Sequence, residues 1–161
     1  MAVAGQGFEP ASGDGLPAPP GGRREAELRT AYEGLLQIRR VVGGPAGAEV
    51  PAPWEVRQLP RAAALVLEAA GIAPSALDAQ GRRTRNGYRV APCAESGRAE
   101  VTWLGPPGGG AAGEEQERLT ACAAVLERHG WVCLLYRGPR GRRFLEVEPP
   151  GGPGGRPVGP G

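Results

Sequence analysis

The sequence predicts an α+β fold: two N-terminal helices followed by a ββαββ unit, in which one helix backs a four-stranded, mostly antiparallel sheet. Three observations lead to this fold class. Apolar residues recur at three- and four-residue steps before residue 80, and they alternate with other residues after residue 87. One further helical pattern lies between two pairs of strand patterns.

The chain has 161 residues, of which 28 are glycine and 18 are proline. These residues dominate 1–22 and 149–161, where bulky apolar side chains are too few to offset the entropy of ordering the backbone. We therefore expect disordered Gly/Pro-rich tails at both ends. Between them we expect a single α+β domain over 23–148, with a helical part over 23–80 and a ββαββ part over 87–148.

Two helical patterns occupy the first half of the domain. Residues 23–42 place their apolar side chains on one stripe, and Gly43 follows as a helix end. Residues 54–70 repeat the pattern. Pro60 must either start or kink this second helix, because it has no backbone N–H to donate. Residues 74–78 carry Ser and Asp at the spacing of a capping box, which predicts a single capped turn.

The second half contains two strand pairs. Residues 88–90 and 101–104 alternate on either side of a turn, which predicts a hairpin. A helix is expected over 114–129, with glutamates at its positive end. Residues 131–136 are apolar on both faces, which is typical of a strand in the middle of a covered sheet. Residues 144–148 have one polar face, and we expect them at the sheet edge, where their two glutamates would discourage further pairing.

The predicted core follows from the faces of these elements. It contains Trp103, Leu119, Cys122, Leu126, Trp131, Cys133 and Leu135. Val132, Leu134 and Tyr136 form a second apolar row on the opposite side of their strand. This row requires a cover, for which the candidates are the N-terminal helices, a second copy of the chain and another protein.

The sequence contains no recognisable catalytic, cofactor-binding or metal-binding pattern. Its single histidine, His129, lies in the last turn of a predicted helix, where a cationic imidazole suits the negative end of the dipole. Cys93, Cys122 and Cys133 form no Cys-x-x-Cys pair, and the absence of lysine excludes a P-loop. We therefore expect a protein that is not an enzyme and needs no cofactor or metal. Without a signal sequence or an apolar membrane span, the cytoplasm is the expected location.

All 19 basic residues are arginine, and the formal net charge is +2. The candidate nucleic-acid contacts lie in two segments: Arg82, Arg83 and Arg85 in the first, and Arg137, Arg140, Arg142 and Arg143 in the second. Residues 139–142, Pro-Arg-Gly-Arg, resemble the core of an AT-hook, with arginine at 143 where that motif continues with proline. The resemblance implies contacts to the minor groove of DNA. The alternative explanation is that both segments are solvated loop charges.

Two functional hypotheses remain. The leading one is a small non-enzymatic interaction or accessory protein that acts through a sheet or helix surface, either by self-association or with a protein partner. The alternative is a nucleic-acid-binding protein that uses the arginines of the loop and the hairpin tip, with a steep dependence on salt.

Overall fold

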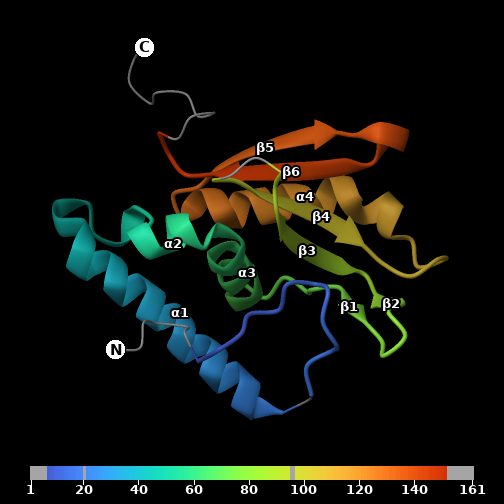
Figure 1. The fold of residues 1–161 in the computed structure, drawn as a ribbon, viewed down its shortest axis with the longest axis horizontal. Coiled ribbons are helices and arrows are strands. Elements are labelled where there is room, and N and C mark those ends of the chain that lie inside the picture. Colours follow the sequence, from blue (N-terminus) through green and yellow to red (C-terminus); the bar gives the residue numbers. More distant parts are fainter. Residues whose placement is uncertain (1–6, 20, 95–96, 152–161) are drawn as a thin grey trace.

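The computed structural model describes residues 7–19, 21–94 and 97–151, and it confirms the α+β fold (Figure 1). The helices are α1 (Gly22–Gly43), α2 (Pro53–Arg57), α3 (Leu59–Ala69) and α4 (Ala111–Arg128), with 3₁₀ turns η1 (Gly44–Glu49) and η2 (Pro139–Gly141). The strands are β1 (Ala76–Leu77), β2 (Arg83–Arg85), β3 (Gly87–Pro92), β4 (Ala99–Leu104), β5 (Val132–Arg137) and β6 (Arg143–Glu148).

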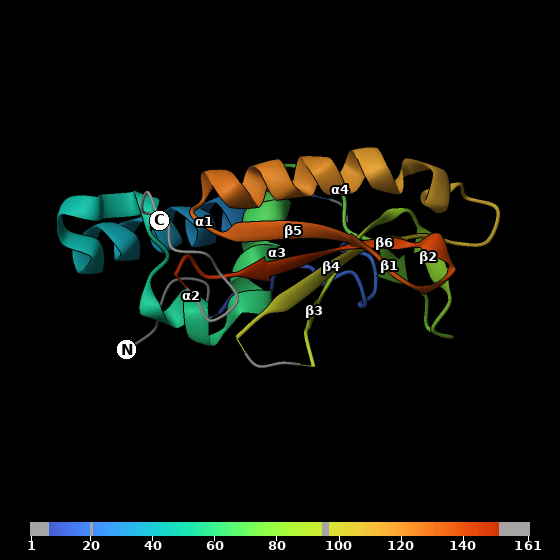
Figure 2. The ribbon, with the colours of Figure 1, turned by 90° about the horizontal axis from the view of Figure 1, so that it is seen from above.

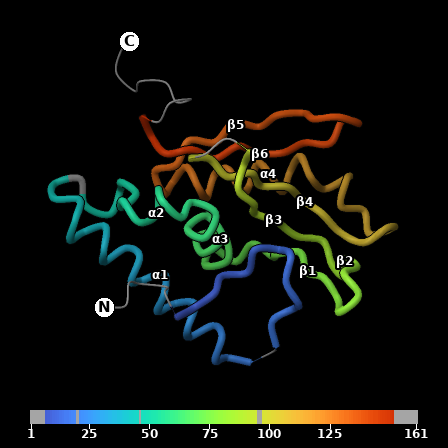
Figure 3. Tube along the Cα trace, viewed as in Figure 1, coloured from blue at the N-terminus to red at the C-terminus, as the bar shows by residue number. Residues whose placement is uncertain are grey.

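The main sheet has four strands in the order β3-β4-β6-β5, and every neighbouring pair is antiparallel. Strands β3 and β4 form one hairpin, and β5 and β6 form the other. Helix α4 carries the chain from β4 to the far edge of the sheet, where β5 begins. Strand β6 then returns into the space between β4 and β5, as the Cα trace shows (Figure 3).

Helices α3 and α4 cover the same face of the sheet, with α4 running along one side of the strands (Figure 2). On this face Tyr88 donates a hydrogen bond from its hydroxyl to the Ala64 carbonyl of α3 at 3.4 Å. Trp103, opposite Tyr88 in the sheet, donates from its indole nitrogen to Glu114 of α4 at 3.0 Å. Helix α1 packs on α3. The N-terminal helices therefore do not cover the opposite face of the sheet. The alternative in which they cover the second apolar row of residues 132–136 is wrong.

The order of the last two strands differs from the prediction. The apolar strand β5 lies at the edge of the sheet, and β6, which was expected at the edge, lies between two neighbours. Glu146 and Glu148 of β6 are thus not on a free edge, and Glu148 is buried beside Arg98. The alternation of side chains defines which faces are apolar, but it does not specify which strand pairs with which.

The expected core is confirmed except at its edge-strand members. Trp103, Leu119, Cys122, Leu126 and Trp131 are buried. Two residues of β5 differ: Cys133 is only partly buried, and Leu135 is 40% exposed. Their exposure follows from the edge position of β5, because no strand lies beyond it in the described part of the chain.

The second predicted helix is two helices. The α-helical backbone is interrupted at Gln58, and Pro60 lies in the first turn of α3, where its missing N–H has no intrahelical partner to lose. Residues 74–78, predicted as a capped turn, instead contain β1, which pairs with β2. Asp78 accepts hydrogen bonds from the backbone of Gln80 and Arg82, so it caps the turn between these two strands.

The expected tail over residues 1–22 includes a segment that packs on the domain. Residues 1–6 and 20 lie outside the described part, whereas residues 8–15 contact the domain. Phe8 is buried, and the Ala11 backbone N–H donates to Glu68 of α3 at 2.9 Å. The prediction weighed only side-chain hydrophobicity, and it missed the backbone and ionic contacts that hold this segment. At the other end, residues 152–161 of the second expected tail lie outside the described residues.

Candidate functional site

The two edges of the sheet differ in what lies beside them. Along β3, the Val90 N–H donates to the Ser12 carbonyl at 2.8 Å. Tyr88 of the same strand exchanges backbone hydrogen bonds with Ala73 and Ser75, at 3.0 and 2.9 Å. Two other segments of the chain therefore cover the β3 edge. Along β5, no described residue pairs with the outer side of the strand.

The open strand carries three large exposed apolar side chains. Leu134, Leu135 and Tyr136 are 43%, 40% and 41% exposed. The Tyr136 ring stacks on Phe144 of β6, with ring centroids 5.5 Å apart, so it is held against the sheet. We call the outer side of Val132–Arg137 the β5 edge (upper edge of the sheet in Figure 1). Unpaired backbone groups beside exposed apolar side chains are the features that promote pairing with another strand.

The side chains of β5 alternate between the two faces of the sheet. Cys133 and Leu135 lie opposite the buried Val147 and Leu145 of β6, and so they share the face covered by α4. The alternate residues, Val132, Leu134 and Tyr136, lie on the opposite face. Among the helices described, those with extensive contacts to the sheet all pack on the first face. The side chains of β5 are thus mainly apolar on both faces of the sheet, and the outer side of this strand pairs with no described residue.

The chemistry near the β5 edge is that of a neutral surface. Burial raises the pKa of the Cys133 thiol to about 12, and the negative charge of Glu127 acts in the same direction. The same effect of burial raises the pKa of Cys122 to about 12. Both thiols are therefore protonated at neutral pH and are poor nucleophiles. Within the described residues, no group of three or more His, Cys, Asp or Glu side chains is placed to hold a metal ion.

The single histidine, His129, makes a structural contact. His129 Nδ1 lies 2.8 Å from the Val125 carbonyl, so this nitrogen carries the proton, and Nε2 accepts a hydrogen bond from the Tyr32 hydroxyl at 2.7 Å. Burial lowers the pKa of His129 from its ordinary value. The imidazole is therefore neutral at pH 7, in contrast to the cationic dipole partner that the sequence suggested.

The structure places the two arginine segments at the same end of the sheet but does not join them. Asn86, at the end of the first segment, donates to Glu114, and Arg142 of the second segment pairs with Glu115 at 2.6 Å. The first turn of α4 thus puts two carboxylates between the segments. The positive charge is divided into two smaller groups.

Three of the seven candidate arginines are ion-paired. Arg83 pairs with Asp14 at 2.5 Å, and Arg142 and Arg143 pair with Glu115, whose side chain is buried. The guanidinium groups of the other four make no hydrogen bond or ion pair within the described residues; these are Arg82, Arg85, Arg137 and Arg140. Residues 139–142, which resemble an AT-hook, form the tight η2 turn between two paired strands.

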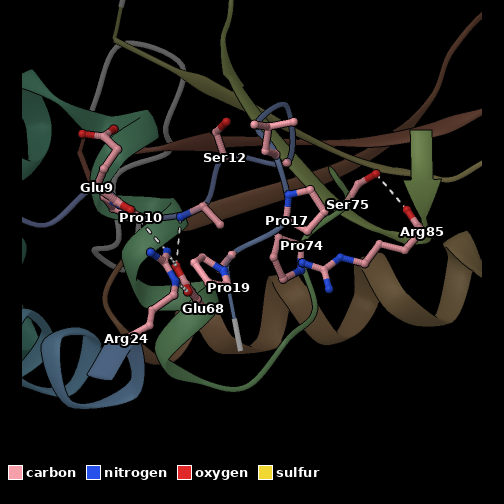
Figure 4. Close-up of a pocket in the computed structure, with 15 residues that line it drawn as sticks. Glu9, Pro10, Ser12, Pro17, Pro19, Arg24, Glu68, Pro74, Ser75 and Arg85 are labelled. Carbon is pink, nitrogen blue, oxygen red and sulfur yellow. Dashed lines mark hydrogen bonds and ion pairs between the residues drawn. The ribbon is translucent and has the colours of Figure 1, made fainter. Parts of the chain in front are cut away.

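A cavity of about 730 Å³ lies beneath the N-terminal segment (Figure 4). Its walls come from residues 9–13 and 15–19 together with Arg24, Glu68, Pro74, Ser75 and Arg85. Arg24 and Glu68 form a two-point ion pair at 2.8 and 2.9 Å, and the Ser75 hydroxyl donates to the Arg85 carbonyl at 2.9 Å. Arg24 and Glu68 also bind the backbone of the segment, through the Glu9 carbonyl and the Ala11 N–H.

The sequence pattern identified Leu134 and Tyr136 as part of an apolar row, but it placed Leu135 in the core and their strand in the middle of the sheet. The structure leaves Leu135 exposed as well and puts the strand at the edge. No described helix is long and apolar enough to cross a membrane. The chain matches no protein-family model, and neither a curated protein nor a solved structure was found to be similar to it.

Proposed function

We propose that this chain is a non-enzymatic interaction protein that binds a strand of another polypeptide along the β5 edge. The observation that carries the proposal is the contrast between the two edges of one sheet. The β3 edge is covered by two segments of the chain, whereas the β5 edge pairs with no described residue and carries three exposed apolar side chains. Addition of a strand to an open edge is a common form of peptide recognition, in which backbone hydrogen bonds provide affinity.

The side chains of β5 support binding rather than solvation. Edge strands that remain unpaired usually carry charges or proline that block pairing. Within β5 only Arg137, at its end, is charged, and the interior of the strand from Val132 to Tyr136 has no charged or proline residue. The strand therefore lacks the usual protection against pairing.

Hydrogen exchange tests this function. The probe is a labelled peptide with the sequence of residues 131–137 carrying Cys133→Ser, mixed with the full chain at a concentration where light scattering gives a monomer. We expect slower exchange of the β5 amides and unchanged exchange of the β3 amides. Leu134→Lys should weaken peptide binding by about tenfold, since it replaces an apolar contact with a charge. Val41→Lys is the matched control, because Val41 is 71% exposed on α1, outside the sheet.

The outcome that contradicts this function is equally specific. The function is contradicted if the β5 amides exchange at the same rate with and without the peptide, and if their exchange rate does not change with the concentration of the protein alone. A scrambled peptide that protects β5 as well as the strand sequence does would also contradict it, because the contact would then be unspecific.

The second candidate, nucleic-acid binding, rests on the four arginines without ion pairs. Two of them, Arg137 and Arg140, lie at the tip of the second hairpin, Arg137 at the end of β5 and Arg140 in the η2 turn. Binding of single-stranded or duplex DNA or RNA at two salt concentrations tests it. Binding that falls steeply with salt and is weakened by Arg140→Ala would support this function, whereas no binding at low salt would remove it.

A further inference from the structure

We propose that the strand that pairs with β5 is β5 of a second copy, in antiparallel register with Leu135 opposite Leu135. This inference rests on the proposed function and names the partner. The residues of β5 are apolar on both faces, as in a strand with neighbours on both sides, yet within the described residues of one copy β5 pairs only with β6. A second copy would turn the edge strand into a central strand of an eight-stranded sheet.

Symmetry limits the registers that are possible. Two identical edges form a continuous antiparallel sheet when a twofold axis runs perpendicular to the sheet between them. This axis keeps α4 of both copies on the same face. Residues directly opposite each other must then share a face, so an odd-numbered residue of β5 lies opposite an odd-numbered one. The registers that retain most of the strand are centred on Leu134 or on Leu135.

The register centred on Leu135 brings the exposed apolar side chains together. Leu135 lies opposite its own copy on the face of α4, and Leu134 lies opposite Tyr136 of the second copy on the other face, twice by symmetry. These are the three large side chains that β5 leaves exposed. In the register centred on Leu134, by contrast, Leu135 and Tyr136 would lie opposite the partly buried Cys133 and Val132.

Charge complementarity favours the same register. Arg137 lies on the face of α4, because its partner Arg143 on β6 pairs with Glu115 of that helix. Centring on Leu135 places Arg137 opposite Cys133 of the second copy. The carboxylate of Glu127 lies close enough to Cys133 to raise the pKa of its thiol. The only charged residue of β5 thus meets an acidic group at the end of α4, once in each half of the dimer.

Light scattering on the full chain and disulfide trapping test this inference. Wild-type protein should show a mass that rises toward that of a dimer with concentration, and Val41→Lys should behave in the same way. Leu135→Lys should weaken association by about tenfold or more, because it places two like charges opposite each other on the axis. Thermal unfolding of Leu135→Lys is the control for folding, since the Leu135 side chain is already 40% exposed.

Two variants, each with one introduced cysteine, separate the registers. In a chain carrying Cys93→Ser and Cys133→Ser, Leu135→Cys should form a disulfide-linked dimer under mild oxidation, because directly opposite Cα atoms lie about 4.5–5.5 Å apart. Leu134→Cys should not, because its two copies would be displaced along the strands. The buried Cys122 thiol remains in both variants and controls for unspecific oxidation.

The outcomes distinguish this inference from the function on which it rests. A strictly monomeric wild-type chain, or a dimer that Leu135→Lys leaves intact, overturns the inference. If such a monomer still binds the strand peptide along β5, the proposed function stands with a different partner. Crosslinking of Leu134→Cys in place of Leu135→Cys overturns the register.

Discussion

Tyr32 and His129, 97 residues apart in the sequence, meet through a hydrogen bond of 2.7 Å between the tyrosine hydroxyl and the imidazole Nε2. The two rings also contact edge to face, with centroids 5.7 Å apart. This contact joins α1 to the end of α4 and thus connects the outer helix to the helix that backs the sheet. It requires the neutral imidazole, because Nδ1 already donates its proton to the Val125 carbonyl.

The first prediction is a loss of stability in mild acid that depends on His129. Burial holds the pKa of His129 below its ordinary value of 6.5, so the unfolded chain binds a proton more readily than the folded one. The stabilising contribution is therefore complete above about pH 6.5 and is lost as the pH falls toward the folded pKa. Urea unfolding at about pH 7.5 and about pH 5 measures it.

The control for this prediction is His129→Gln, whose stability should change less between the two pH values, since His129 is the only histidine. Tyr32→Phe should cost about 1–3 kcal/mol at neutral pH, because it leaves Nε2 without a donor in a half-buried position. An identical pH dependence in wild type and His129→Gln would contradict the assignment.

The second prediction concerns the buried ion pair between Arg39 of α1 and Glu55 of α2. The two groups bond at 2.7 and 2.6 Å, and neither side chain is exposed to solvent. Glu55 also accepts the Ala52 N–H at 3.0 Å. Arg39→Met should lower the free energy of unfolding by about 3–5 kcal/mol, because it leaves a buried carboxylate without its partner.

A double variant tests the physical cause. Arg39→Met combined with Glu55→Gln should be more stable than Arg39→Met alone, since glutamine is neutral and its amide oxygen still accepts the Ala52 N–H. Arg23→Met is the matched control on the same helix. Arg23 pairs with Glu27 at the surface with its own side chain 92% exposed, so its loss should cost no more than about 0.5 kcal/mol.

The third prediction is that Asp14 holds the N-terminal segment over the β3 edge. Its carboxylate pairs with Arg83 and with Arg89, at 2.5 and 2.7 Å. Partial burial acts to raise the pKa of Asp14, but hydrogen bonds and charge from these two arginines outweigh it, and the pKa lies below its ordinary value of 3.8. Asp14→Asn should therefore speed the hydrogen exchange of the Val90 amide, which donates to Ser12.

The stabilising contribution of Asp14 is lost in a more acidic range than that of His129. Its stabilising contribution is present above pH 3.8 and is lost as the pH falls through the lowered pKa of the folded chain. The difference between wild type and Asp14→Asn should thus shrink in strong acid. Glu9→Gln is the control, because Glu9 pairs with Arg61 from a side chain that is 82% exposed. Equal exchange at Val90 in all three proteins would show that the segment is held in another way.

Helices and hairpins were predictable where one local period dominates. The stripe of α1 and the apolar face of α4 each bury one side, and the structure confirms both helices. Pro60 was expected either to start or to kink the second helix, because proline has no N–H to donate, and it lies in the first turn of α3. The strand β1 was missed because its two residues are too few to show an alternation.

The apolar character of both rows of β5 was predictable from the order of residues, because side-chain alternation is a local property of an extended chain. Which strand lies at the edge was decided only by tertiary structure. Strand pairing depends on the path of α4 across the sheet and on the return of β6 between β4 and β5. Neither feature produces a periodic pattern of residues in the sequence. The separation of the arginines into two groups was also decided by tertiary structure. Glu114 and Glu115 lie between the two arginine segments only after α4 has docked on the sheet.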